Sequence, residues 1–500
     1  MSGKSVIIIG AGLAGLSTGC YAQMNGYRTH IFEQHTRPGG VCTAWKRKGY
    51  TIDGCIHWLM GAKPGSAYYR LYQEVGALDG NRLVYLDHFV RFVDETTGHR
   101  LDLTADLERL EADVKALSPQ DGPVIEELLS GMRAFQGFNQ PLDRPAELMG
   151  ALDNLKQVWR VRHWLKYLTR YAMPVAEFAQ RLHHPFLRWA VPNVFVPEMP
   201  TFFLFVLLAQ LAAGELATVE GGSLEFALAV ARRYKALGGQ VTYGALVEEI
   251  LVEGDRAVGI RLADGSEHRG DVVISAADGY STIYKMLGGK YIDDSIKEQY
   301  DTWKLFTPIL MVSFGVAQPF AGQPSEHALR LQKPLLVGGR QVDSMSCRLF
   351  NRDATLAPAG KTVVQMLLDA DFDYWNALQA DRPRYQAEKE RVAAEVLDRL
   401  EAHWPGLLAR VEMTDVATPY TFWRYTRNQR GAFEGWLMTP AQLSKPLRKT
   451  LPGLENLYMA GQWVEPGGGV PTALYSGRQV AQLICHRDGK PFVTTTPQAK

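Results

Sequence analysis

The fold of this chain is decided by residues 5–15, which read SVIIIGAGLAG. The four aliphatic residues from Val6 to Ile9 predict a buried parallel strand, and the segment from Ala14 to Asn25 predicts a helix. The turn between them has the spacing GxGxxG. Such a turn leaves N–H groups free at the N-terminus of the helix, and these groups favour a phosphate. The stretch therefore predicts an α/β fold with a dinucleotide site.

Each glycine of this turn has its own role. Gly10 permits the tight turn, Gly12 lets a pyrophosphate approach the backbone, and Gly15 lets the helix pack close to the sheet. A second predicted strand, residues 28–32, is followed directly by Glu33. A carboxylate at this place can accept hydrogen bonds from both hydroxyls of an adenosine ribose, and it disfavours a 2′-phosphate.

The composition excludes several classes of protein. Of the 500 residues, 54 are Lys or Arg and 53 are Asp or Glu, so the net charge is near +1. Nucleic acid is not an expected partner, because no basic excess is present to neutralise phosphates. The five cysteines are scattered and form no CxxC pair, so we expect neither a disulfide scaffold nor a metal site, and the reducing cytoplasm is the expected compartment. The length predicts two or three domains.

The apolar stretches predict a soluble protein. The run from Val6 to Ile9 is too short for a signal peptide, and the longest run, 202–213, is shorter than the ~20 residues of a membrane span. Segment 202–213 is either a core helix or a helix that docks on a membrane surface. Upstream of it, residues 160–167 read RVRHWLKY, a mix of cations and aromatic rings that is expected at a lipid headgroup boundary.

Later segments alternate between helical and extended patterns. Residues 76–215 have a mainly helical pattern, and Ser223 can cap a further helix. Three runs, 246–252, 257–262 and 271–276, are separated by turn residues and predict a β-meander. A final strand, 457–460, leads into a helix that starts near Pro471. The order of elements between 286 and 450 is not indicated by any pattern.

Two further glycine-rich segments indicate which dinucleotide is bound. Glu33 is followed by Arg37-Pro38-Gly39-Gly40, and residues 457–471 read LYMAGQWVEPGGGVP. With the GxGxxG turn, they resemble the FAD motifs of the phytoene desaturase, carotenoid isomerase and retinol saturase family. The resemblance implies a flavoprotein of the two-dinucleotide-binding-domain (Rossmann-like) type, with FAD as cofactor and an inserted substrate domain of helices and sheet. One difference is Gln462, where the family often has an Asp that binds a ribityl hydroxyl.

The resemblance also implies which residues hold the FAD. In the family, the segment matching 53–58 runs beneath the flavin, a backbone at Val247 meets the adenine edge, and the last helix aims its N-terminus at the flavin. The implied cofactor residues are Gly10, Gly12, Leu13, Ala14, Gly15, Glu33, Gln34, Arg37, Gly39, Gly40, Val41, Ile56, Val247, Gly461, Gln462, Gly469 and Val470. The implied division is an FAD domain of residues 1–75, 216–285 and 455–490, a substrate domain of 76–215 and 286–454, and a tail of 491–500.

Two features are candidates for contact with a substrate. His57 either acts as a proton donor or substrate anchor near the flavin, or is a buried histidine bonded to backbone groups. The aromatic and basic stretch 421–436 either lines a tunnel for a flat apolar substrate or packs domains together. Its candidate substrate residues are Trp423, Tyr425, Phe433 and Trp436.

The resemblance implies an FAD-dependent oxidoreductase that desaturates, saturates or isomerises carbon–carbon bonds of a lipophilic polyene. Two alternatives remain: a flavin amine oxidase, and a non-catalytic prenyl binder similar to Rab GDP-dissociation inhibitors, against which the intact glycine set argues. Because a polyene barely dissolves in water, peripheral contact with a membrane is expected. The chain has one strand–GxGxxG–helix unit, so we expect no dedicated NAD(P)H domain.

Overall fold

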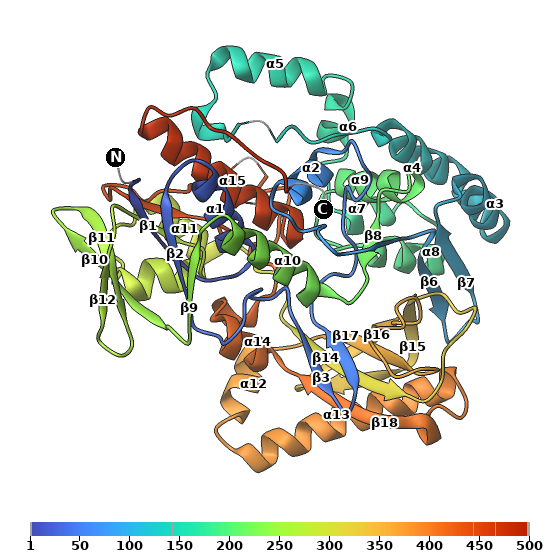
Figure 1. The fold of residues 1–500 in the computed structure, drawn as a ribbon. Helices are drawn as coiled ribbons and strands as arrows, with labels where there is room; N and C mark the ends of the chain where they lie inside the picture. The colour runs from blue at the N-terminus through green and yellow to red at the C-terminus, as the bar shows by residue number, and fades with distance from the viewer. Residues whose placement is uncertain (1–2, 143, 444, 466, 498–500) are drawn as a thin grey trace.

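A computed structural model describes residues 3–142, 144–443, 445–465 and 467–497. Its centre is a five-stranded parallel sheet in the order β19-β13-β1-β2-β9. The strands are β1 (Ser5–Ile9), β2 (Arg28–Glu33), β9 (Gln240–Tyr243), β13 (Val272–Ser275) and β19 (Leu457–Met459). They come from three distant parts of the sequence, residues 5–33, 240–275 and 457–459, and Figure 1 shows β1 and β2 in blue and β9 in green. The predicted α/β fold with a parallel sheet is confirmed.

Three helices pack beside this sheet: α1 (Leu13–Met24), α10 (Ser223–Ala236) and α15 (Gly469–Arg487). Helices α1 and α15 approach closely at glycine, since a Cβ at Gly477 would lie 2.6 Å from the Thr18 nitrogen. Gly15 is equally constrained, because a Cβ there would lie 2.0 Å from the Gly10 carbonyl oxygen. The role predicted for Gly15, close packing of the first helix, therefore agrees with the structure.

The β-meander differs from the prediction in its third strand. Its strands are β10 (Val247–Glu253), β11 (Arg256–Leu262) and β12 (Glu267–Arg269). The run 271–276, which we expected in the meander, instead forms β13 of the central sheet. All four residues of β13 are buried, as suits a strand covered on both faces of a parallel sheet.

A seven-stranded sheet forms the second layer, in the order β18-β14-β17-β16-β15-β6-β7. Strands β6 and β7 precede residue 215, and the other five follow residue 286, so two distant segments build one sheet. A parallel pairing of β6 with β15 joins them, and every other pair is antiparallel. The strands are β6 (His88–Asp94), β7 (Arg100–Thr104), β14 (Ile309–Val316), β15 (Glu326–Val337), β16 (Arg340–Leu349), β17 (Thr362–Asp369) and β18 (Val411–Ala417).

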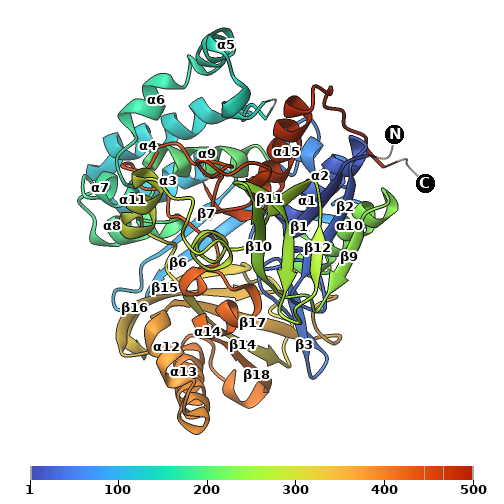
Figure 2. The ribbon, with the colours of Figure 1, turned by 90° about the vertical axis from the view of Figure 1, so that its left-hand side faces the viewer.

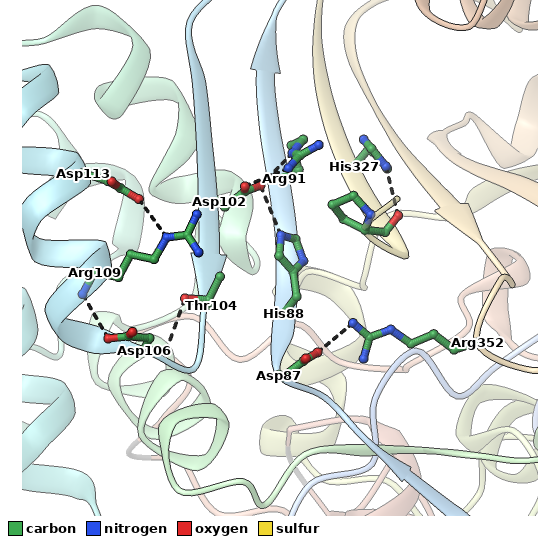
Figure 3. Close-up of polar contacts among 11 residues, drawn as sticks. Asp87, His88, Arg91, Asp102, Thr104, Asp106, Arg109, Asp113, His327 and Arg352 are labelled. Carbon is green, nitrogen blue, oxygen red and sulfur yellow. Dashed lines mark hydrogen bonds and ion pairs between the residues drawn. The ribbon is translucent and has the colours of Figure 1, made fainter. Parts of the chain in front are cut away.

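Polar contacts fix the edge of this sheet. His88 and Arg91 both point at Asp102 on the neighbouring strand (Figure 3), with nitrogen–oxygen distances of 3.1 and 2.7 Å. The Arg91 hydrogen bonds are the main cause that lowers the pKa of Asp102 to about 2. Asp87 and Arg352 form an ion pair that ties the start of β6 to the loop after β16. The two halves of the sheet are thus held by charge as well as by backbone pairing.

Two smaller ribbons and further helices complete the fold. The ribbons pair β3 (Ala44–Arg47) with β4 (Tyr50–Asp53) and β5 (Leu83–Tyr85) with β8 (Ala217–Val219). The other helices are α2 (Ala67–Glu74), α3 (Leu107–Leu117), α4 (Gly122–Phe135), α5 (Ala151–Val161), α6 (Leu165–Arg170), α7 (Val175–Ala179), α8 (Pro185–Ala190), α9 (Thr201–Ala212), α11 (Asp294–Thr302), α12 (Phe372–Leu378), α13 (Arg382–His403) and α14 (Pro419–Thr426).

Helix α9 contains the apolar run of residues 202–213, and it lies in the core of the helical layer. Leu204, Phe205, Leu207 and Leu208 are buried, and Phe205 packs on Gly131 of α4. Of the two interpretations of this segment, the structure supports the core helix. Within the described residues, no helix is both long enough and apolar enough to cross a bilayer.

Helices α5 and α6 have the opposite character. No residue of either helix is buried, and α5 lies at the far end of the molecule from the seven-stranded sheet (Figure 1, Figure 2). Four of its apolar side chains are exposed: Leu152 (74%), Leu155 (66%), Val158 (50%) and Trp159 (66%). The exposed apolar surface of the helical layer is therefore on α5 and not on α9.

Candidate functional site

One cavity of about 530 Å³ lies where the three pieces of the central sheet domain meet. Its wall includes the turn after β1, the end of β2, the loop 39–42, the start of β10, the end of β13 and the segment around the start of α15. These are the carboxyl ends of parallel strands together with helix N-termini, where open α/β sheets bind ligands. Residues 425–428, 433 and 434 complete the wall.

Glu33 is the buried carboxylate at the end of β2. It accepts hydrogen bonds from the Ala11 N–H at 2.6 Å and from the His35 N–H at 2.8 Å. Burial raises the pKa of Glu33, and the two backbone bonds act in the opposite direction. Glu33 therefore braces the glycine turn, and its oxygens retain further lone pairs that can accept ribose hydroxyls.

Backbone atoms of glycine-rich loops form much of one side of the cavity. The Gly39 N–H donates to the Ala11 carbonyl at 2.9 Å, so the second glycine loop lies directly on the first. A Cβ at Gly40 would lie 3.3 Å from the Cα of Gly12, and one at Gly461 would lie 3.4 Å from the Cβ of Ala14. No side chain caps the N-termini of α1 and α15, so their N–H groups can bind an anion. This cradle fits the pyrophosphate and ribityl parts of FAD.

Most of the sequence-predicted cofactor residues lie in this wall. Tyr425 and Phe433, two of the four candidate substrate residues, line the cavity with them. The cofactor residues found there are Gly10, Gly12, Leu13, Ala14, Glu33, Gln34, Gly39, Gly40, Val41, Val247, Gly461, Gln462, Gly469 and Val470.

Five other predicted residues lie outside the lining. Arg37 is exposed and donates to the Ala44 carbonyl, and Ile56 is buried with its N–H on the Ser223 hydroxyl. Trp436 is buried and donates to the Trp463 carbonyl at 3.2 Å. The ring of Trp423 stacks against the Arg427 guanidinium, and Gly15 packs on Gly10. Trp423 and Trp436 therefore serve packing in this structure.

His57 is partly buried and also lies outside the lining. Burial, reinforced by the nearby Arg348 guanidinium, holds the pKa of His57 well below its usual value. The Arg348 side chain is itself paired with Glu326 and donates to the Ile56 carbonyl. A neutral imidazole beside a cation is a poor proton donor at neutral pH, so this geometry argues against a role of His57 as a proton donor.

Glu434 is a functional candidate that the sequence analysis did not single out. It faces the cavity between Phe433 and Gly435, and it packs on the backbone of Gly468, just before α15. No hydrogen bond or ion pair reaches its carboxyl group from the described residues. Burial raises the pKa of Glu434 to about 7. An acid with this pKa in a cavity can donate or accept a proton at neutral pH.

Asp278, shortly after β13, is a further buried acid of the wall. Burial raises its pKa to about 6, although the Ser281 and Gln429 N–H groups both donate to it. Its carboxyl group is thus occupied in holding the segment 428–431 against the central sheet. The sequence around Glu434 carries no distinctive signal, because the position of this acid in the wall and its lack of a partner among the described residues are visible only in the fold.

Comparison with known proteins supports the assignment of a flavin cofactor to this protein. A family model described as flavin containing amine oxidoreductase matches residues 13–485. The chain is 25% identical to a lycopene-forming phytoene desaturase of Pseudescherichia vulneris, over 96% of this chain and 99% of that one. It is also 25% identical to a chloroplastic prolycopene isomerase of Arabidopsis thaliana, over 96% of this chain and 82% of that one. A solved oxidoreductase of Methanosarcina mazei has the same fold, with a TM-score of 0.61 at 18% identity and coverage of 96% and 100%.

Replacing Glu33 tests the cofactor site. We expect Glu33→Ala to weaken FAD binding at least about tenfold, since a hydrogen bond to a charged group contributes about 1.5–3 kcal/mol. The dissociation constant of FAD for the apoprotein, measured by quenching of flavin fluorescence, gives the result. Glu248→Ala is the matched control, because Glu248 is an exposed acid of the same wall. An unchanged constant for Glu33→Ala would show that Glu33 only braces the turn.

Proposed function

The chain belongs to the family of flavin-containing amine oxidoreductases and is an FAD-dependent enzyme, and from this premise we propose that it acts on carbon–carbon bonds of a lipophilic polyene. The reaction is desaturation, saturation or cis–trans isomerisation. The observation that carries the proposal is the nearly full-length similarity to one enzyme named for desaturation of phytoene and one named for isomerisation of prolycopene.

The residues of the cavity support this assignment. The glycine cradle, Glu33 and the N-termini of α1 and α15 would hold the FAD, which supplies two-electron hydride chemistry when bound. Phe433, Trp463 and Val470 make the part of the wall near α15 apolar, and such a wall suits a hydrocarbon substrate. The amine oxidase alternative has less support, because the phytoene desaturase and the prolycopene isomerase, which are similar in sequence over 96% of this chain, are named for polyenes.

We assign the proton-handling role to Glu434. Saturation of a double bond adds a hydride to one carbon and a proton to the other, and desaturation removes a hydride and a proton. The Glu434 carboxyl faces the cavity and has no partner among the described residues, so it is free to exchange a proton with a bound molecule. Its raised pKa keeps it protonated in a large fraction of molecules near neutral pH.

We further propose the domain division of the sequence analysis. Residues 1–75, 216–285 and 455–490 form the FAD domain, and 76–215 and 286–454 form the substrate domain, with 491–500 as a tail. The course of the sheets supports this division, because the five parallel strands all come from the first group and the seven-stranded sheet draws only on the second.

The surface that contacts a membrane is proposed to be α5 and α6, in place of the segment 202–213. The exposed residues Leu152, Leu155 and Trp159 recur at helical spacing and form one apolar face. Residues 151–170 contain five Lys or Arg and one acid, Asp153, although the whole chain is nearly neutral. An amphipathic basic helix of this kind binds anionic lipid. Peripheral attachment to the cytoplasmic face of a membrane would bring the enzyme to a water-insoluble substrate.

The function is tested by adding carotenoids, retinoids and amines to the purified flavoprotein without oxygen. Bleaching of the oxidised flavin by a polyene would identify desaturation, and return of its colour from the reduced state would identify saturation. A change of double-bond geometry without net change in flavin colour would identify isomerisation. Bleaching by amines, with no response to any polyene, would overturn the proposal.

Glu434→Gln tests the proton-handling role. For a proton-donating reaction, we expect wild-type activity to fall as the pH rises through about 7, where the carboxyl loses its proton. The variant should lose about 100-fold or more in rate and should no longer show this decline, since an amide does not titrate. The FAD content of the variant should equal that of the wild type. Glu248→Gln is the control, and an unchanged pH profile for Glu434→Gln would exclude the role.

Flotation with anionic liposomes tests the membrane surface. We expect the wild type to float and the double variant Leu155→Glu and Trp159→Glu to lose more than about 90% of its binding, because each exposed apolar side chain contributes about 1.5–3 kcal/mol when buried in lipid. Its melting temperature should not change, because both side chains are exposed. Leu408→Glu, at another exposed leucine in a different region, is the control. Equal flotation of the double variant would show that α5 is not the attachment site.

A further inference from the structure

Two cysteines face each other in the wall of the flavin cavity. Strands β3 and β4 pair antiparallel, with Ala44 opposite Asp53, and the Gly54 N–H continues the pairing with a bond of 2.9 Å to the Thr43 carbonyl. The next opposite positions in this register are Cys42 and Cys55. The proximity of the Cys55 thiol is the main cause that raises the pKa of Cys42, as expected for two thiols that lie side by side. Both residues line the cavity.

The surrounding contacts hold this pair in place. The Cys42 thiol donates to the Ser223 carbonyl, with the sulfur 3.2 Å from the oxygen. On the other strand, the Asp53 carboxylate accepts the Cys55 N–H at 3.0 Å and the Ser223 N–H at 2.6 Å. Ser223 is therefore linked to both cysteine segments, which restrains the two thiols relative to each other.

The geometry is compatible with a disulfide. Residues directly opposite in an antiparallel pair have Cα atoms about 4.5–5.5 Å apart, and a disulfide needs about 4.4–6.8 Å. Cys55 is only partly buried, so it is the accessible thiol of the two. The contact with Cys55 and burial hold the pKa of Cys42 well above its usual value.

We propose that Cys42 and Cys55 are a redox-active pair that exchanges two electrons with the flavin bound in this cavity. Oxidation breaks two S–H bonds and forms one S–S bond, and the two electrons and two protons released pass to the oxidised flavin. Reduction of the disulfide is the reverse. The pair would store a second electron pair beside the cofactor in a chain whose sequence predicts no nicotinamide domain. The proposal rests on the FAD site and is independent of which substrate the enzyme uses.

The other three cysteines provide internal controls. Cys20 in α1, Cys347 in β16 and Cys485 in α15 are buried and belong to separate packing environments. None of the three lines the cavity. Treatment of the holoprotein with a mild thiol oxidant, followed by denaturation and alkylation, should therefore leave three cysteines labelled. The intact mass before alkylation should fall by the mass of two hydrogens, and peptide mapping should find the bond between residues 42 and 55.

The decisive measurement is an anaerobic dithionite titration of the oxidised holoprotein. We expect the wild type to take up four electrons per flavin, two for the flavin and two for the disulfide. Cys42→Ser and Cys55→Ser should take up two, and Cys347→Ser should take up four. Uptake of two electrons by the wild type, with all five cysteines labelled after oxidant treatment, would overturn the proposal. The labelling is done on the wild type, so it decides the question even if a serine variant fails to fold. Because dithionite replaces the substrate, failure of the polyene proposal would leave the result unchanged.

Discussion

The buried contact between Asp53 and Ser223 is the constraint on which the assembly of this protein depends. Asp53 ends β4 in the first part of the chain, and Ser223 begins α10 in the second, yet the Ser223 N–H donates to the carboxylate at 2.6 Å. The Asp53 carbonyl accepts a hydrogen bond from Gln365 of β17 at 2.8 Å, so the seven-stranded sheet is tied to the same residue. A Cβ at Gly222 would lie 2.5 Å from Asp53 Oδ2, so only glycine permits this approach. Asp53 thus joins the two proposed domains, with its carboxylate bonded to Ser223 and its backbone carbonyl bonded to Gln365.

Sequence reasoning succeeded where a local pattern has only one physical solution. The run Val6–Ile9 followed by GxGxxG predicts a buried parallel strand, a tight turn and a helix. The next strand of the same unit ends at Glu33, so the place of this carboxylate was predictable too. The third meander strand was misplaced because a short, fully apolar run reads the same in an antiparallel edge and in a parallel sheet. The order between residues 286 and 450 was not predictable, since β15 pairs with β6 from more than 200 residues earlier, and no local pattern encodes that partner.

The candidate site shows the same limit. The glycines and Glu33 contact a cofactor through backbone and charge, so their residue types are diagnostic on their own. Glu434 and the Cys42–Cys55 pair acquire their properties only from their surroundings in the fold. Glu434 has a raised pKa because it is buried without a partner among the described residues, and Cys42 is notable because a second thiol, Cys55, lies beside it. The two interpretations of the apolar run in α9 could not be separated from the sequence for a related reason, because the partner of Phe205 is Gly131 of α4, and this contact is visible only in the fold.

Glu434 also shows how two opposing effects can set the pKa of a proton-exchanging group. Its carboxyl group packs on Gly468, immediately before α15, and the partial positive charge of a helix N-terminus favours the ionised form. Burial among Phe433 and other apolar wall residues favours the neutral form, and it is the larger effect, since the pKa is raised to about 7. A hydrogen-bond donor aimed at the carboxylate, such as those that hold Asp278, would shift this balance towards the ionised form. The lack of such a donor among the described residues is therefore what keeps Glu434 able to both give and take a proton near neutral pH.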